Sequence, residues 1–184
     1  MNKLVSYIVL LLCLSLTACS GNSTEEFTEI DAQNAYDNLK GTYVGNMLVD
    51  NVPTSVSVVI GSDFSVRYLP VNSLLSRIFT SDAELQAAIK SAAGVVYNAP
   101  TVSIAISGDQ LRLSMEPTDL VFNVTVNDHV YTVAALMTAT VLYNHSFDTL
   151  SLSMTVDELS CNGVTYNLSQ DGITYFIDTA TRQK

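Results

Sequence analysis

The sequence predicts an all-β domain with a minor helical part, and two observations carry this prediction. Apolar and polar residues alternate with a period of two through most of the chain beyond residue 41, as in strands that have one buried face. Turn signals rich in Gly, Asn and Asp separate these runs, so successive strands are expected to pair as antiparallel neighbours. We expect an antiparallel meander forming a barrel or a two-sheet sandwich, with a short N-terminal helix and one inserted helix.

A short helix and a hairpin open the predicted domain. Asp31 is expected to cap a helix that runs through Leu39, and Gly41 is expected to end it. Two alternating runs then predict a hairpin around a Gly61-Ser62 turn. Their apolar positions are Val56, Val58 and Ile60 before the turn, and Phe64, Val66 and Tyr68 after it.

The same alternation predicts the later strands. Its apolar sets are Val102-Ile104-Ile106, Leu111-Leu113-Met115, Leu120-Phe122-Val124-Val126, Leu150-Leu152-Met154-Val156, Val164-Tyr166-Leu168 and Ile173-Tyr175-Ile177. The segment from Tyr131 to Tyr143 keeps one face apolar for longer than a usual strand of about 5 to 6 residues. We therefore expect a bend or bulge near Ala134-Ala135.

One interior helix is predicted from residue 82 to residue 93. The sequence Ser81-Asp82-Ala83-Glu84 has the pattern of a capping box, and Gly94 ends the helix. The apolar stripe on this helix is narrow and consists of small and medium side chains. We expect it to lie as a lid across one end or one face of the sheet.

The N-terminus has the pattern of an export signal. Lys3 is followed by an apolar run over residues 4–16, and Leu16-Thr17-Ala18-Cys19 has the form of a lipobox. This arrangement resembles bacterial lipoproteins, in which the cysteine becomes the first residue and receives acyl chains. The predicted organisation is a signal peptide over residues 1–18, a lipid-anchored flexible tether over residues 19–30, and one domain over residues 31–184. Cys19 is the predicted lipidation site and the contact with the membrane.

The tether and two short motifs resemble exported proteins of Bacteroidetes. Glu25-Glu26 is similar to the acidic stretch that follows the cysteine in surface lipoproteins of that group. Asp148-Thr149-Leu150 and Asp178-Thr179-Ala180 are similar to its Asp-Thr-aliphatic O-glycosylation motif. The resemblance implies an outer-membrane protein on the periplasmic or the surface-exposed face, with Thr149 and Thr179 as candidate glycosylation sites.

Two further resemblances concern the fold. The layout of a short helix, a hairpin, a Leu-Pro crossover and a meander resembles small Bacteroidetes lipoproteins, several families of which have no assigned activity. The segment Gly41-Thr42-Tyr43-Val44-Gly45 is similar to the Gly-x-Trp start of lipocalin-like barrels, with Tyr43 in place of the tryptophan. The lipocalin-like similarity covers this first strand.

Composition and charge limit the function. With 8 basic and 18 acidic residues the formal charge is −10, which disfavours nucleic-acid binding. His129 and His145 lie in polar stretches typical of turns, and no cluster of metal-ligand spacing occurs, so we expect neither a metal nor another cofactor. Asp157-Glu158 is the obvious carboxylate doublet for catalysis, but neighbours on a regular strand point to opposite faces. We expect no enzymatic activity and no catalytic residue.

What the domain binds is left open by the sequence. Tyr43, Tyr131, Tyr143, Tyr166 and Tyr175 lie in predicted strands, either in the core or as contacts to a ligand. Cys161 is expected to be a small buried hydrophobic residue without a disulfide partner. The leading expectation is a non-catalytic binding module for a small apolar or glycan ligand. The alternatives are an adhesion or assembly module that binds an envelope protein, and a glycoside hydrolase with two carboxylates.

Overall fold

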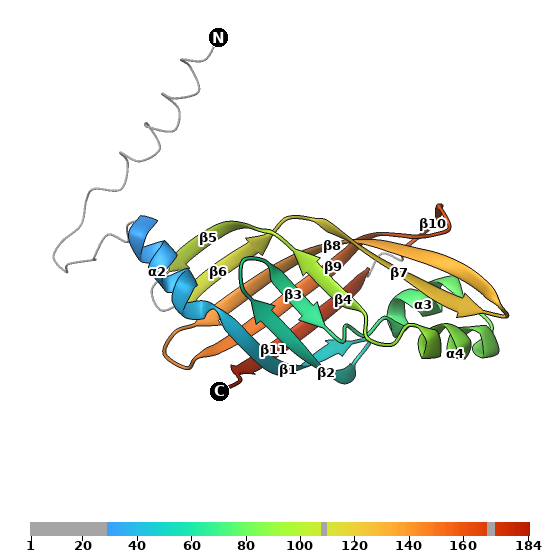
Figure 1. Cartoon of the computed structure of the whole chain (residues 1–184), viewed down its shortest axis with the longest axis horizontal. Coiled ribbons are helices and arrows are strands. Elements are labelled where there is room, and N and C mark those ends of the chain that lie inside the picture. Colours follow the sequence, from blue (N-terminus) through green and yellow to red (C-terminus); the bar gives the residue numbers. More distant parts are fainter. Residues whose placement is uncertain (1–28, 108–109, 169–171) are drawn as a thin grey trace, which may run out of the picture.

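The computed structural model describes residues 29–107, 110–168 and 172–184 (Figure 1). The predicted signal peptide, Cys19 and most of the predicted tether lie outside these residues. In the described part, none of the helices combines the length and the apolar character that a membrane crossing requires.

The predicted all-β class is confirmed, because the described ranges are mostly strand. They contain eleven strands and three short helices, joined by turns and loops. The helices are α2 (Glu29–Leu39), α3 (Asn72–Ile78) and α4 (Asp82–Ser91). The strands are β1 (Gly41–Val49), β2 (Val52–Ile60), β3 (Phe64–Arg67), β4 (Val96–Ala99), β5 (Thr101–Ser107), β6 (Gln110–Met115), β7 (Thr118–Val126), β8 (His129–Asn144), β9 (Thr149–Cys161), β10 (Val164–Tyr166) and β11 (Ile173–Arg182).

The strands form one antiparallel sheet that curls into a nearly closed barrel. Its order is β4-β3-β2-β1-β11-β9-β8-β6-β5, while β7 adds to β8 and β10 adds to β9. The strands at the two ends of this order, β4 and β5, are consecutive in the chain and are separated only by Pro100. The chain thus passes directly from one edge of the sheet to the other, which favours the barrel over the sandwich.

The predicted long strand is confirmed, with an irregularity near the expected position. β8 has 16 residues, and the successive strands β6 and β7 together pair with most of its length. The register between β8 and β9 shifts at Leu136/Met137, next to Ala134-Ala135, but the extra residue is Asp157 of β9 and not a residue of β8. Bulges increase local twist, which a strand of this length needs in order to follow a barrel.

A second bulge lies in β11 and requires a glycine opposite it. The pairing of β11 with both β1 and β9 shifts between Ile177 and Ala180. A Cβ atom on Gly45 of β1 would lie 2.9 Å from the Ala180 Cβ and 2.9 Å from the Ile177 Cγ2. Gly45 therefore allows the close approach of the two strands, and Asp178 and Thr179 both remain exposed.

Apolar side chains fill the inside of the barrel as one cluster. Among the largest are Tyr43, Phe64, Tyr97 and Tyr175, each fully buried. Tyr97 spans the interior, since its hydroxyl on β4 donates a hydrogen bond to the Met137 carbonyl on β8 (3.0 Å). The alternation that predicted the strands identified most of the buried face, but Val102 and Val164 of the predicted apolar sets are 59% and 60% exposed.

Helices lie at both ends of the barrel (Figure 1). At one end, α2 begins at Glu29, so Asp31 lies inside the helix and does not cap it. Gly41, which we expected to end α2 in a left-handed conformation, has a φ of 158° and is the first residue of β1. The β8–β9 hairpin and the C-terminus lie at the same end as α2.

The other end carries α3 and α4, of which only α4 was predicted. α3 contributes the fully buried Leu74 and Leu75 to the core. α4 packs along the edge of β7, and its Ser91 Oγ accepts a hydrogen bond from the Thr125 backbone N–H (2.9 Å). Tyr68, expected to face the core as the last residue of a strand, has a φ of 63° and is 64% exposed where the chain leaves β3 for α3.

Candidate functional site

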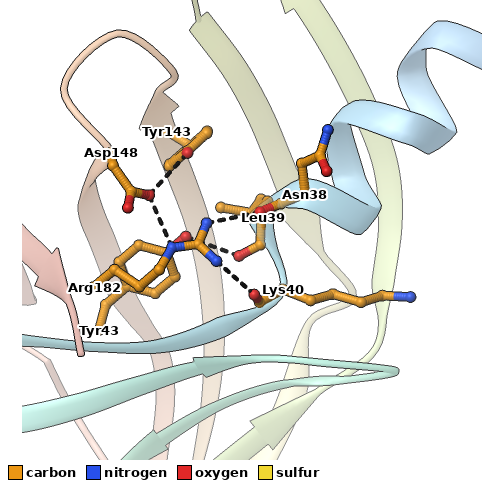
Figure 2. Close-up of polar contacts among 7 residues, drawn as sticks. All are labelled: Asn38, Leu39, Lys40, Tyr43, Tyr143, Asp148 and Arg182. Carbon is orange, nitrogen blue, oxygen red and sulfur yellow. Dashed lines mark hydrogen bonds and ion pairs between the residues drawn. The ribbon is translucent and has the colours of Figure 1, made fainter. Parts of the chain in front are cut away.

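A polar cluster closes the end of the barrel at which α2 lies, and Arg182 is at its centre (Figure 2). Arg182 is the last residue of β11, and its guanidinium reaches the C-terminal turn of α2. Nη2 donates a hydrogen bond to the Asn38 carbonyl (2.7 Å), and Nη1 donates one to the Lys40 carbonyl (2.8 Å). These carbonyls have no partner within the helix and carry partial negative charge, so the cation both satisfies and stabilises them.

The same guanidinium binds the β8–β9 hairpin. Its Nε donates a hydrogen bond to Asp148 Oδ1 (2.9 Å), and the Tyr143 hydroxyl donates one to the same oxygen (3.0 Å). The guanidinium carbon lies 5.1 Å from the centre of the Tyr43 ring, which is a cation–π distance. One side chain thus connects β11, α2, β1 and the β8–β9 hairpin.

The charges of this cluster are compensated internally. Burial on its own would raise the pKa of Asp148, but the hydrogen bonds from Arg182 and Tyr143 outweigh burial and lower it. Burial raises the pKa of Tyr43, whose hydroxyl donates to the Leu39 carbonyl (2.8 Å). Arg182 and Asp148 pair with each other, and the hydroxyls of Tyr43 and Tyr143 act as neutral hydrogen-bond donors. This cluster therefore holds α2 in position and offers no free nucleophile or base.

A groove of about 330 Å³ lies at the opposite end of the barrel. Three aromatic side chains line it: Phe79, which follows α3, Tyr131 of β8 and Tyr166 of β10. The Phe79 and Tyr131 ring centres are 5.3 Å apart and the ring planes are perpendicular, so the two rings form the walls of a corner. We call this site the aromatic groove; its remaining lining residues are Ile78, Glu84, Cys161, Asn162 and Val164.

Among the described residues, Glu84 is the only charged one in the lining of the aromatic groove. The predicted capping box is not formed, because the Ser81 side chain makes no cap hydrogen bond at the start of α4. Glu84 is half-buried and makes no ion pair or side-chain hydrogen bond within the part of the chain that the structure describes. Its carboxylate is therefore available to a ligand.

The floor of the aromatic groove is held rigidly by the β9–β10 turn. Asn162 Oδ1 accepts a hydrogen bond from the Thr132 N–H (2.9 Å), and the Asn162 N–H donates one to the Thr132 carbonyl (2.9 Å). Cys161 is buried as expected, and burial raises the pKa of its thiol. The two hydrogen bonds between Asn162 and Thr132 join the β9–β10 turn to β8 beside the groove.

A second groove, of about 230 Å³, lies between the β1–β2 turn and the helices α3 and α4. At its wall the Ser73 hydroxyl donates a hydrogen bond to Asp50 Oδ2 (2.5 Å). The buried Tyr175 hydroxyl has no hydrogen-bond partner among the described residues, and burial, followed by the charge of Asp50, raises its pKa. The carboxylate of this groove is already engaged, unlike that of Glu84.

The two predicted glycosylation motifs lie side by side on β9 and β11. Leu150 of the first motif pairs with Ala180 of the second. Thr149 is half-buried at the start of β9, next to Asp148, which is held by Arg182. Thr179 is exposed in the bulge of β11. Of the two hydroxyls, that of Thr179 is the more accessible, whereas Cys19 lies outside the described residues.

The predicted polar candidates do not gather into a reactive site. His129 is the first residue of β8 and His145 lies in the β8–β9 turn, and both are exposed. Asp157 and Glu158 do not point to opposite faces as expected, because the bulge in β9 leaves both exposed. Within the described ranges, no group of three or more His, Cys, Asp or Glu side chains is arranged to hold a metal ion.

Sequence reasoning identified part of the aromatic groove. Tyr131 and Tyr166 were among the strand tyrosines left open between core and ligand contact, and both are half-buried in the groove. Phe79 was missed, because it follows a helix that the sequence did not predict. Glu84 was assigned to a helix cap, and Arg182, a single basic residue at the end of an apolar strand, was not noticed as a signal.

Comparisons with protein-family models, with curated proteins and with solved structures give no match to this chain.

Proposed function

We propose that this protein is a non-catalytic, lipid-anchored binding module of the cell envelope and that its ligand occupies the aromatic groove. The observation that carries the proposal is the chemistry of this groove. It combines about 330 Å³ of space, three aromatic rings and the two polar side chains of Glu84 and Asn162. Small-molecule sites typically have this composition, with apolar and aromatic walls and a few fixed polar groups.

We assign the ligand to the groove and not to the barrel interior. A lipocalin-type site would need open space between the strands. Here Tyr43, Phe64, Tyr97 and Tyr175 fill the interior, each with no exposed surface. The aromatic groove instead has lining residues from the end of α3, from α4 and from β8, β9 and β10. Figure 1 shows α3 and α4 at the end of the barrel opposite to α2.

The anchor is proposed from the lipobox that ends at Cys19 and from the position of α2. The described chain begins with α2, at the end of the barrel opposite to α3 and α4 (Figure 1). An acyl chain on Cys19 would attach the protein at the α2 end, so the aromatic groove would face away from the anchoring membrane. The proposed location is the outer membrane, in keeping with the resemblance to Bacteroidetes lipoproteins, and the exposed Thr179 is the preferred glycosylation site.

A neutral apolar dye and a panel of neutral oligosaccharides test the binding proposal on the chain from residue 20 onward. This chain retains every described element of the fold. We expect Nile red fluorescence to rise on binding, or one oligosaccharide to give a saturable signal, and Tyr166→Leu to weaken that binding at least fivefold. Phe147→Leu is the matched control, because Phe147 is 75% exposed in the β8–β9 turn at the α2 end. Equal binding by both variants would contradict the proposal.

An assembly module is the second candidate, and β5 is the observation that favours it. β5 is the last strand in the sheet order and carries no charged residue, and Val102 in it is 59% exposed. Uncharged terminal strands can add a strand from another chain. If β5 acts in this way, the purified domain should form dimers as its concentration rises, and Ala105→Lys should abolish them in sedimentation velocity experiments. A monomer at every concentration would contradict self-assembly.

The carboxylate hydrolase receives the least support. The aromatic groove has Glu84 as the one acidic residue among its described lining residues, and the second groove has Asp50. A smaller groove of about 150 Å³ beside β8 and β9 likewise has Asp178 alone. Glycoside hydrolysis by two carboxylates needs a pair about 5 to 9.5 Å apart across one cleft. Asp157 is already engaged, since its carboxylate accepts a hydrogen bond from Thr138 Oγ1 (3.2 Å).

A further inference from the structure

We infer that the ligand of the aromatic groove is a small organic cation, with an alkylated ammonium group held between the aromatic rings and Glu84. This inference rests on the proposed function, because it names the class of ligand that the same groove takes. Three features of the described residues carry it: the arrangement of the rings, the unpaired carboxylate, and the absence of basic side chains from the lining.

The rings supply faces suited to a cation. An aromatic ring is negative on its faces, so a cation gains energy over each face that it contacts. The Phe79 ring is buried and packs edge to face against the Tyr131 ring, at 5.3 Å between centres, so the half-buried Tyr131 is the more accessible of these two rings. Tyr166 adds a third ring to the same lining. Alkylated ammonium groups are commonly bound by such sets of rings, because their methyl groups are apolar and their charge is spread.

Glu84 supplies the opposite charge. It is half-buried in the groove, where a charge interacts more strongly than in bulk water. It lies in the first turn of α4, whose N-terminus carries a partial positive charge of about half a unit. Asp82 lies in the same turn but is exposed and outside the lining, so the first turn of α4 carries two acidic residues, of which Glu84 alone lies in the groove.

Within the described ranges, no basic side chain lines the groove or pairs with the Glu84 carboxylate. Arg77 is close to Phe79 in the sequence, but it is exposed and is not part of the lining. Lys90 is exposed in the last turn of α4, at the other end of the helix from Glu84. The formal charge of −10 for the whole chain also attracts cations and repels anions such as phosphate esters. The Glu84 carboxylate would repel an anionic ligand, and a neutral ligand could donate a hydrogen bond to it but not neutralise its charge.

Choline and its neutral isostere 3,3-dimethylbutan-1-ol separate charge from shape. Both would be titrated into the chain from residue 20 onward, with proton NMR of the methyl groups as the measurement. We expect choline to bind at least tenfold more tightly than the isostere. Its methyl signals should shift upfield, because they would lie over the ring faces.

Glu84→Gln tests the role of the carboxylate while keeping the shape of the side chain. It should weaken choline binding at least tenfold and change binding of the isostere by less than twofold. Glu158→Gln is the matched control, since Glu158 is exposed on β9 and does not line the groove. It should change neither affinity by more than twofold. Circular dichroism and the Tm of each variant establish that the fold is retained.

The remaining outcomes separate this inference from the proposed function. Equal binding of choline and its isostere, or full choline binding by Glu84→Gln, would overturn the cation inference. If only Nile red or an oligosaccharide binds, and Tyr166→Leu weakens that binding, the groove is a site for a neutral ligand and the cation inference is wrong. If no probe binds, both proposals fail.

A covalent readout complements the titration. Cys161 lines the groove and is the one cysteine in the chain from residue 20 onward. Choline bound in the groove should slow alkylation of its thiol by N-ethylmaleimide at least threefold, and the neutral isostere at the same concentration should not. Equal slowing by both compounds would count against recognition of the charge.

Discussion

The two ends of the barrel differ in how their helices are held. At the α2 end, a polar network around Arg182 joins α2 to β1, β11 and the β8–β9 hairpin. At the opposite end, α3 and α4 pack mainly through apolar side chains, and two grooves lie beside them. The difference follows from the side chains that meet at each end. Arg182 satisfies helix carbonyls and a hairpin carboxylate together. Glu84, at the other end, has no such partner within the described residues. The polar groups of the α2 end are thus used to hold α2 in place, whereas Glu84 at the grooved end is free to contact a ligand.

Removing the centre of the closed end should have the largest effect on stability. Arg182→Ala deletes two hydrogen bonds to helix carbonyls, the ion pair with Asp148 and the contact with the Tyr43 ring. We expect the free energy of unfolding to fall by about 2–3 kcal/mol, measured by urea denaturation. Arg67→Ala, which removes an exposed arginine at the end of β3, should change it by less than about 0.5 kcal/mol. Equal effects of the two variants would show that α2 is held by other contacts.

The same substitution at two buried tyrosines should have opposite consequences at the two ends. Tyr43→Phe removes a hydroxyl that donates to the Leu39 carbonyl and should cost about 1–2 kcal/mol. Tyr175→Phe removes a buried hydroxyl without a partner among the described residues, so it should leave stability unchanged or raise it by up to about 1 kcal/mol. Thermal and urea denaturation of both variants would measure this. A loss as large at Tyr175 as at Tyr43 would show that the Tyr175 hydroxyl has a partner.

Acid should weaken the closed end first. The pKa of Asp148 is lowered in the folded protein, so its carboxylate binds fewer protons there than in the unfolded chain. Its contribution is therefore present above the unfolded pKa of about 3.9 and is lost as the pH falls through the lower folded value. The carboxyl is half exposed, so Asp148→Asn should cost less than about 1 kcal/mol at pH 7. Denaturation between pH 7 and pH 2 should show a shallower acid loss for Asp148→Asn than for wild type, and parallel curves would contradict this.

The smallest loss in the free energy of unfolding is expected from a change at the contact between α4 and β7. Ser91→Ala removes the acceptor for the Thr125 N–H, at an exposed position where water replaces the lost bond. We expect a loss of about 0.5 kcal/mol or less. Amide hydrogen exchange should show faster exchange at Thr125, while the amides of β1 and β11 keep their rates. Faster exchange throughout the barrel would mean that α4 stabilises the whole fold.

The sequence by itself determined most of the strands and most of the buried face, although β4 was not predicted. Period-two alternation placed residues such as Val133, Met137 and Val141 of β8 in the core, because a regular strand turns alternate side chains to one side. It also identified Tyr131 and Tyr166 as candidates. Local patterns suffice for such properties, since each depends on residues only two positions apart.

Only the tertiary structure decided the bulges, the second inserted helix and the composition of the aromatic groove. An extra residue in β9 or β11 is defined by the partner strand, so local alternation could not show that Asp157 and Glu158 are both exposed. Phe79, Glu84 and Tyr166 come from three separate segments and meet only when the barrel has formed. Arg182 likewise caps a helix more than 140 positions earlier in the chain. Contacts between distant segments depend on topology, and no local pattern encodes them.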